Sequence, residues 1–306
     1  MPTDNLISKI KNRESDIVLY GITPPKKGTS EEKVAEISAR QVERLQNLNV
    51  DGLVLYDIQD EKSRTDEERP FPFMETLDCY DYSQQHLTNL KIPKIVYRAV
   101  GKYSETELSD FLTQAEPNEV LSIFVGAASK SQEVTVSISD AYKIKARTQS
   151  DVLLGGVVIP ERHQTKGDEH LRVFQKIAQG CTFFVSQGVY DVNASKNFLS
   201  DYYYYGKEHN IPLVPILFTL TPCGSAKTLQ FMKWLGISIP KWLENDLIHS
   251  NDILLRSVDV SEQSYRELKA FADEKGIPVG CNIESVAIRK VEVDASIELL
   301  ERVSKA

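Results

Sequence analysis

The sequence lacks the features of a membrane-spanning, secreted or nucleic-acid-binding protein. No stretch of its 306 residues approaches the roughly 18–20 apolar residues needed to span a bilayer. Residues 1–16 are polar and lack the apolar segment of a signal peptide. The net charge is −8, and no block of Lys and Arg suits a phosphodiester backbone. We therefore expect no membrane partner and no nucleic-acid partner.

Cysteine is scarce, and the motifs of metal and nucleophilic sites are missing. The four cysteines, at positions 79, 181, 223 and 281, are far apart and form no CxxC pair. Zinc sites and disulfide frameworks need closer spacing, so neither is expected, and the cytoplasm is the expected setting. The chain also has no HExxH and no GxSxG motif. We expect no metal site and no covalent hydrolase.

What the sequence does contain is an alternation of short apolar runs and amphipathic segments. The apolar runs are 16–22, 51–57, 93–99, 119–126, 151–160, 181–187, 212–218 and 278–285. The amphipathic segments are 30–48, 78–90, 104–115, 137–147, 169–179, 193–208, 224–235 and 286–303. Continuous apolar runs are typical of parallel strands that helices cover. The eight pairs predict an α/β fold, a closed (β/α)8 TIM barrel, in a single domain over 1–306.

Two segments exceed what such a barrel needs. A charged loop at 59–78 follows the second strand, on the side where barrels place their active sites. It suits either a lid over a ligand or a solvated surface loop. A second extra segment, at about 236–261, is inserted between the seventh unit and the last strand.

Five polar residues are expected at or just beyond the carboxyl ends of the strands, where barrel chemistry sits. They are Asp57, Arg98, Glu161, Gln187 and Glu284. The Gln187 amide can donate and accept together, which suits the edge of a planar ligand or a bond to loop backbone. Asp57 and Arg98 form an ion pair or contact a ligand. Glu284 follows an apolar run and is either a general acid or part of a structural pair.

Four stretches carry a family resemblance: "GGVVIPERH", "LRVFQKIAQGCTFFVSQGVYD", "IPLVPILFTLTP" and "FMKWLGISIPKWL". Over about 151–243 the chain resembles the methylenetetrahydrofolate reductase family, whose members are (β/α)8 barrels that bind FAD. The resemblance implies reduction of 5,10-methylenetetrahydrofolate to 5-methyltetrahydrofolate. The reductant would be a nicotinamide, NAD(P)H, acting directly or through FAD, and the partner a small-molecule folate. The tyrosine-rich segment 201–209 suits outer packing or a contact between copies in a homo-oligomer.

The resemblance also assigns site residues. Gln187 would contact the pterin or the nicotinamide, and Phe231 would flank that ligand. Arg98 is expected in the substrate site from its place at a strand end. The residues expected to hold the cofactor are Glu161, His163, Glu169, Arg172 and Lys176.

The chain lacks two acidic residues that are typical of the family. The acid of strand one, which protonates the folate, falls on Gly21, and the acid of the loop after strand four falls on Ala127. Glycine transfers no proton, so Glu284 and Asp57 become the candidate replacements. Losing a general acid costs about 10²–10⁴-fold in rate, which permits slow activity.

Three functions therefore stay open. The first is a divergent reductase with a replacement acid. The second is a folate- or one-carbon-ligand-binding protein, or a methyl-transfer partner, that performs no reduction. The third is an unrelated barrel lyase or aldolase, which would need a Schiff-base lysine at a strand end, and none of the eight ends has one.

Overall fold

The computed structural model describes residues 6–60, 65–127, 132 and 134–304. The strands form a closed barrel in the order β1 to β8, and neighbouring strands from β1 to β5 and from β6 to β8 pair in parallel. They are β1 (Val18–Ile22), β2 (Gly52–Leu55), β3 (Lys94–Ala99), β4 (Val120–Val125), β5 (Leu154–Val158), β6 (Cys181–Gly188), β7 (Ile216–Leu220) and β8 (Val279–Glu284). The (β/α)8 barrel predicted from the sequence is confirmed.

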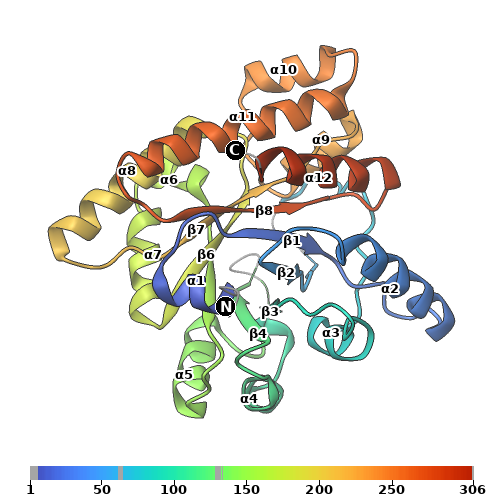
Figure 1. The fold of residues 1–306 in the computed structure, drawn as a ribbon, viewed down its shortest axis with the longest axis vertical. Coiled ribbons are helices and arrows are strands. Elements are labelled where there is room, and N and C mark those ends of the chain that lie inside the picture. The colour runs from blue at the N-terminus through green and yellow to red at the C-terminus, as the bar shows by residue number, and fades with distance from the viewer. Residues whose placement is uncertain (1–5, 61–64, 128–131, 133, 305–306) are drawn as a thin grey trace. The chain divides into compact units, whose positions relative to one another are not determined.

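Helices follow the strands along the chain (Figure 1). They are α1 (Leu6–Asn12), α2 (Glu31–Leu45), α3 (Cys79–His86), the short η2 (Val100–Lys102), α4 (Glu105–Gln114), α5 (Ile138–Thr148), α6 (Pro160–Lys166), α7 (Glu169–Ala178), α8 (Val192–His209), α9 (Ala226–Trp234), α10 (Lys241–His249), α11 (Ile253–Asp273) and α12 (Lys290–Val303). Local sequence explains their starts. Ser104, for example, caps α4 in a capping box with Glu107.

The chain forms two compact units. The first comprises the described part of Met1–Ile7, with Leu19–Glu67 and Pro72–Gly155. The second comprises Ser8–Val18, Glu68–Phe71 and Gly156 to the end of the described chain. The first unit holds β2, β3 and β4, and the second holds β6, β7 and β8. The expectation of a single domain over 1–306 stays a prediction.

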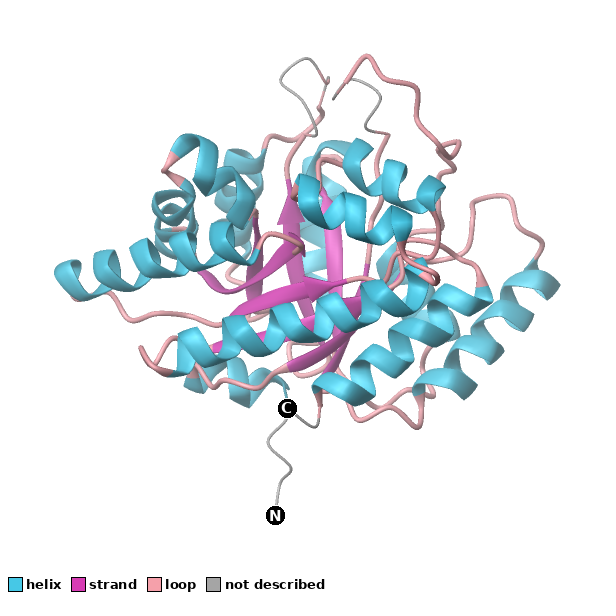
Figure 2. Ribbon diagram, turned by 90° about the horizontal axis from the view of Figure 1, so that it is seen from above, coloured by secondary structure: helices cyan, strands magenta, loops and turns pink. Residues whose placement is uncertain are grey.

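Within each unit the helices, cyan in Figure 2, cover one side of the magenta strands. Every residue of β2, β3 and β7 is buried, as continuous apolar runs predict. Close backbone packing also selects glycine in β8. A Cβ on Gly280 would lie 2.2 Å from the Ile17 carbonyl oxygen, which accepts the N–H of Cys281 at 2.9 Å.

The region between β7 and β8 differs from the sequence prediction. Helix α11, and not the segment 224–235, contacts β7, β8, α8 and α12 and therefore covers the seventh unit. The extra segment consists of α9 and α10, and its expected boundary at 261 falls inside α11. Buried Val258, Tyr265, Leu268 and Ala272 recur at helical spacing and mark the packed face of α11. The predicted boundary at 261 fell between these residues and so divided the pattern. Figure 1 shows α10 beside α11.

All four cysteines are buried and unbonded to one another. Burial raises the pKa of the Cys79 thiol well above its ordinary value, and raises the pKa of Cys223 to about 12. Within the described residues, no helix is both long and apolar enough to cross a membrane.

Candidate functional site

Gln187 lies near the end of β6, where the pairing with β7 is irregular. The register shifts between Val185 and Gly188, so β6 carries an extra residue there. Such a bulge re-aims side chains at a strand end. The Gln187 side chain is partly buried, and its Nε2 donates to the carbonyl oxygen of Leu235 at 2.8 Å. The sequence allowed Gln187 to bind either a ligand or loop backbone. The bond to loop backbone is present, and it uses only the nitrogen of the side-chain amide.

A buried polar ladder supports this strand end. The Thr219 hydroxyl donates to the Ser186 carbonyl at 2.6 Å, and the Thr219 N–H donates to the Ser186 hydroxyl at 2.8 Å. Asn282 Nδ2 in turn donates to the Thr219 hydroxyl at 3.0 Å. The ladder joins β6, β7 and β8 immediately before Gln187 and Glu284. Because β6 and β8 both run parallel to β7, these two residues end their strands at the same edge.

The helix α9, whose C-cap Gln187 contacts, carries two stacked aromatic side chains. Phe231 and Trp234 stack with an interplanar angle of 16°, and Leu235, which follows them, is the α9 C-cap whose carbonyl Gln187 binds. Phe231, the expected ligand-flanking aromatic, is 8% exposed. Trp234 was missed in the sequence, although its i, i+3 spacing from Phe231 places the two on one helix face.

The segment 68–71 of the long loop after β2 packs against the same helix. The Phe71 ring meets Phe231 edge-on with centroids 5.2 Å apart. The Arg69 guanidinium lies 5.2 Å from the Phe231 ring centroid and 4.9 Å from that of Trp234. Lys227 on α9 lies 4.7 Å from the Phe71 ring. This part of the expected lid therefore covers Phe231, whereas residues 61–64 lie outside the described residues.

In the first unit, both carboxylate oxygens of Asp57 accept hydrogen bonds. Its Oδ2 accepts from the Ala99 N–H and the Tyr103 hydroxyl, both at 2.8 Å, and its Oδ1 accepts from Lys102 at 2.5 Å. Asp57 is thus held by three donors, one of them the Lys102 ammonium. Its expected role as a replacement acid stays a prediction.

Arg98 is paired with Asp78, the N-cap of α3, and not with Asp57 as one prediction had it. The Tyr103 hydroxyl lies between the two predicted partners, 3.0 Å from Arg98 and 2.8 Å from Asp57. The guanidinium also lies 4.2 Å from the Phe111 ring centroid. Although burial alone would raise it, the nearby Arg98 charge lowers the pKa of Asp78. These contacts hold the Arg98 guanidinium in place, and its expected role in substrate binding stays a prediction.

Glu161 and His163 lie on α6, whereas a strand end and a loop were predicted for them. Proline at the first helical position, after β5, starts this short helix. Glu161 is 7% exposed, and neither oxygen meets hydrogen-bond geometry with a described residue. Burial, with the negative charge of Asp191, raises its pKa to about 8, although nearby backbone N–H groups of Glu161 and Tyr190 oppose the shift. The carboxyl is therefore mostly neutral at pH 7.

The remaining residues expected to hold a flavin bind other groups of the protein. Glu169, 1% exposed, accepts the Ile159 N–H at 2.9 Å and pairs with Arg162 at 3.2 Å. Arg172 pairs with Asp168 at 3.3 Å and lies 3.9 Å from Glu169.

Lys176 points inward and donates to the Val157 carbonyl at 2.5 Å, and burial lowers its pKa. Phosphate binding needs cations directed at the ligand, and neither Arg172 nor Lys176 is so directed here. This arrangement does not fit the flavin diphosphate.

The two positions that lack the family's acids are placed where the alignment of motifs expects them. Gly21 is a buried residue of β1 that pairs with Val54, and Ala127 is exposed just after β4. Glu284, the last residue of β8, is partly buried and stays a candidate acid with Asp57.

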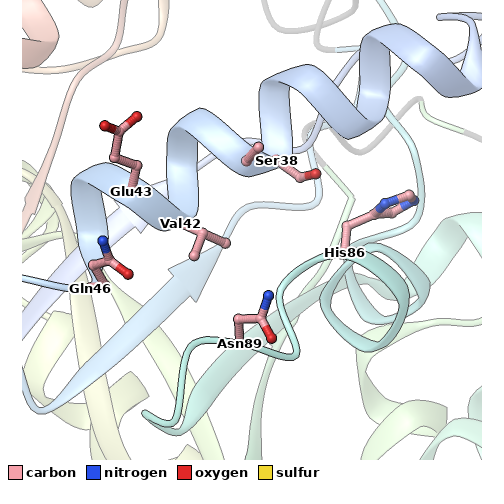
Figure 3. Close-up of a pocket in the computed structure, with 7 residues that line it drawn as sticks. Ser38, Val42, Glu43, Gln46, His86 and Asn89 are labelled. Carbon is pink, nitrogen blue, oxygen red and sulfur yellow. The ribbon is translucent and has the colours of Figure 1, made fainter.

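Surface grooves lie elsewhere. One of 330 Å³ is formed between α2 and the end of α3, with Ser38 and Val42 facing His86 and Asn89 (Figure 3). Another of 390 Å³ lies at the end of α8. Both are formed by outer helices and not by strand ends, so we do not assign the candidate site to them.

The fold is a (β/α)8 barrel, with polar side chains at the carboxyl ends of β6 and β8 and aromatic side chains on α9. The family model described as methylenetetrahydrofolate reductase matches residues 118–275. A solved structure of an uncharacterized protein from Clostridium thermocellum, which binds two copies of 5-methyl-5,6,7,8-tetrahydrofolic acid, is 53% identical. The match covers 98% of this chain and 99% of that one, with a TM-score of 0.88. The chain belongs to the methylenetetrahydrofolate reductase family.

Other comparisons add little. A structure of 2,3-dimethylmalate lyase, a PEP mutase/isocitrate lyase superfamily member, is 14% identical over 96% of this chain and 93% of its own, with a TM-score of 0.42. That similarity carries no functional argument. No curated protein sequence matches the chain.

Proposed function

We propose that this chain binds a reduced folate, with 5-methyltetrahydrofolate as the ligand, at the carboxyl ends of β6 to β8. The observation that carries the proposal is the bond from Gln187 to the α9 C-cap. It brings the Gln187 amide beside the turn that bears Phe231 and Trp234. The 53% identical protein that binds two copies of this folate supports the choice of ligand.

A pterin is a flat heterocycle with alternating donors and acceptors along its edge. The Gln187 nitrogen is held by Leu235, which fixes the plane of the amide and aims its oxygen. An oxygen so fixed accepts a ring N–H, while an aromatic face contributes contact area. Because Phe71 and Arg69 cover Phe231, we propose that they move or re-pack when the ring enters.

Reduction of methylenetetrahydrofolate is the second candidate, favoured by the position of Glu284 at the end of β8. In this reaction Glu284 would give a proton to N10 as the bond from N10 to the methylene carbon breaks. NAD(P)H would then deliver a hydride to the resulting iminium carbon, which leaves 5-methyltetrahydrofolate and the oxidised nicotinamide. The step needs correct placement of donor and acceptor and no further carrier.

Calorimetric titration with 5-methyltetrahydrofolate tests the binding proposal. We expect wild-type saturation with one or more sites per chain and at least about tenfold weaker binding for Gln187→Ala, a loss of about 1.4 kcal/mol. Gln114→Ala, at the exposed end of α4, is the matched control and should bind as the wild type does. Absence of binding by the wild type would refute the proposal.

A separate assay tests reduction. High enzyme concentrations are mixed with NADH or NADPH and methylenetetrahydrofolate, and nicotinamide absorbance is followed. Oxidation that Glu284→Gln slows about 100-fold or more supports the second candidate. No oxidation with either nicotinamide rejects it and leaves folate binding as the function.

A further inference from the structure

Three metal-ligating side chains meet on the helices that follow β5 and β6. His163 lies in the last turn of α6 and His170 in the first turn of α7. Gly167, with a φ of +66°, ends α6 in the left-handed conformation and reverses the chain between them. Asp201 lies on α8, which packs against both α6 and α7 (Figure 1). The three residues therefore come from three helices, and no short sequence motif contains all of them.

Their donor atoms are close together. One ligand atom from each residue lies within 4.8 Å of the other two. The Nε2 of His163 is 2.9 Å from Oδ2 of Asp201, and the two imidazole centroids are 5.2 Å apart. The His163 side chain is 5% exposed, whereas that of Asp201 is 55% exposed. The cluster is thus anchored on a buried histidine and open to solvent on its carboxylate side.

The buried ring nitrogens also suit a metal. Nδ1 of each histidine is buried and has no hydrogen-bond partner among the described residues. Imidazoles and a carboxylate form the donor set that zinc-class ions prefer.

We propose that His163, His170 and Asp201 form a binding site for one divalent zinc-class ion. Three protein ligands leave the fourth tetrahedral position to water. Zinc–ligand bonds of about 2.0–2.1 Å place ligand atoms roughly 3.3 Å apart, so the present cluster closes on the ion by shifts of about 1 Å. His170 and Asp201 are not fully buried and can make these shifts. The ion would tie α6, α7 and α8 together.

The test uses tag-free, chelator-treated protein titrated with Co²⁺, whose visible spectrum reports coordination, and with Zn²⁺ in competition. We expect one Co²⁺ per chain, displaced by Zn²⁺, and a rise in Tm with Zn²⁺. Asp201→Asn and His170→Ala should each weaken Co²⁺ binding about 100-fold or more. His209→Ala, also on α8, is the control and should bind as the wild type does.

Asp201 is exposed, so its asparagine variant should keep the fold, which circular dichroism verifies. Failure of the folded wild type to bind Co²⁺ stoichiometrically, or equal binding by Asp201→Asn and wild type, would overturn the proposal. The titration contains no folate, so its result is independent of the folate-binding proposal.

Discussion

The amide nitrogen of Gln187 donates to the main-chain carbonyl of Leu235 at 2.8 Å and so fastens the end of β6 to the end of α9. Leu235 is a helix C-cap, and carbonyls at a helix end have no partner inside the helix. Gln187 therefore satisfies a helix end with one atom and keeps its oxygen out of that bond. A structural role and a recognition role are compatible in this one side chain.

This bond predicts a modest stability effect for Gln187→Ala. The Leu235 carbonyl loses its side-chain donor, and one net hydrogen bond is worth about 0.5–1.5 kcal/mol. The free energy of unfolding, measured by urea denaturation, should fall by about that amount. A loss above roughly 3 kcal/mol would show that the side chain acts mainly in the core.

The packing of segment 68–71 on α9 predicts a kinetic effect. Phe71 covers Phe231 edge-on, so a ligand that stacks on Phe231 must first displace it. Phe71→Ala should therefore speed association of 5-methyltetrahydrofolate several-fold in stopped-flow experiments that follow tryptophan fluorescence. Met74→Ala, at an exposed position of the same loop, should leave the rate unchanged. Slower association of the Phe71 variant would mean that this ring contributes to the ligand site.

The raised pKa of Glu161 predicts a pH-dependent stability. The folded carboxyl titrates at about 8, against an ordinary value of 4.5. Between these pH values the folded state binds more protons than the unfolded state, so the free energy of unfolding falls as pH rises. The contribution over the whole window is at most roughly 5 kcal/mol.

Glu161→Gln should remove this dependence and be more stable than the wild type at pH 8. Denaturation curves between pH 5 and about 8.5 measure the difference. Glu208→Gln, at an exposed position of α8, should follow the wild-type curve. A Glu161→Gln effect that is constant with pH would contradict a neutral buried carboxyl.

Gly224 should tolerate no side chain. An added Cβ would lie 2.4 Å from Cγ and Oε1 of Glu292, which is fully buried. The Glu292 carboxylate accepts the Gly224 N–H at 2.9 Å, the Thr228 hydroxyl at 2.9 Å and Arg289 at 2.7 Å. Gly224→Ala would displace this carboxylate and should cost at least about 2 kcal/mol of unfolding free energy.

Gly126→Ala provides the comparison for that variant. The nearest atom to its added Cβ is 3.5 Å away, an ordinary contact. Thermal denaturation should show a clear drop in Tm for the Gly224 variant and little change for the Gly126 variant. Equal values of Tm would show that Glu292 relaxes without cost.

The barrel was predictable because most residues of its strands are buried. Apolar runs such as 119–126 have no polar face, and only a parallel, helix-covered sheet accommodates eight of them. The predicted boundary at 261 divided α11 wrongly, because α9 and α10 precede this helix and have the same helical periodicity. Periodicity identifies a helix but does not say which helix packs on the strands.

The place of a side chain at a strand end was predictable where an apolar run leads directly to it. Gln187 near the end of β6 is such a case, and its role in ligand binding stays a prediction. The contacts of Asp57 and Arg98 were not predictable, because their partners come from other parts of the first unit: Asp78 from a helix N-cap, and Lys102 and Tyr103 from the turn after β3. Spatial neighbours of this kind leave no spacing pattern in the chain.

Because all four cysteines are buried, their reactivity reports how often the fold opens locally. A thiol with a pKa near 12, such as Cys223, has almost no thiolate while the fold is closed. Alkylating reagents can then react only during transient opening. The labelling rate of each cysteine would measure how often its part of the barrel opens, and ligand or metal ion that stabilises that part would slow it.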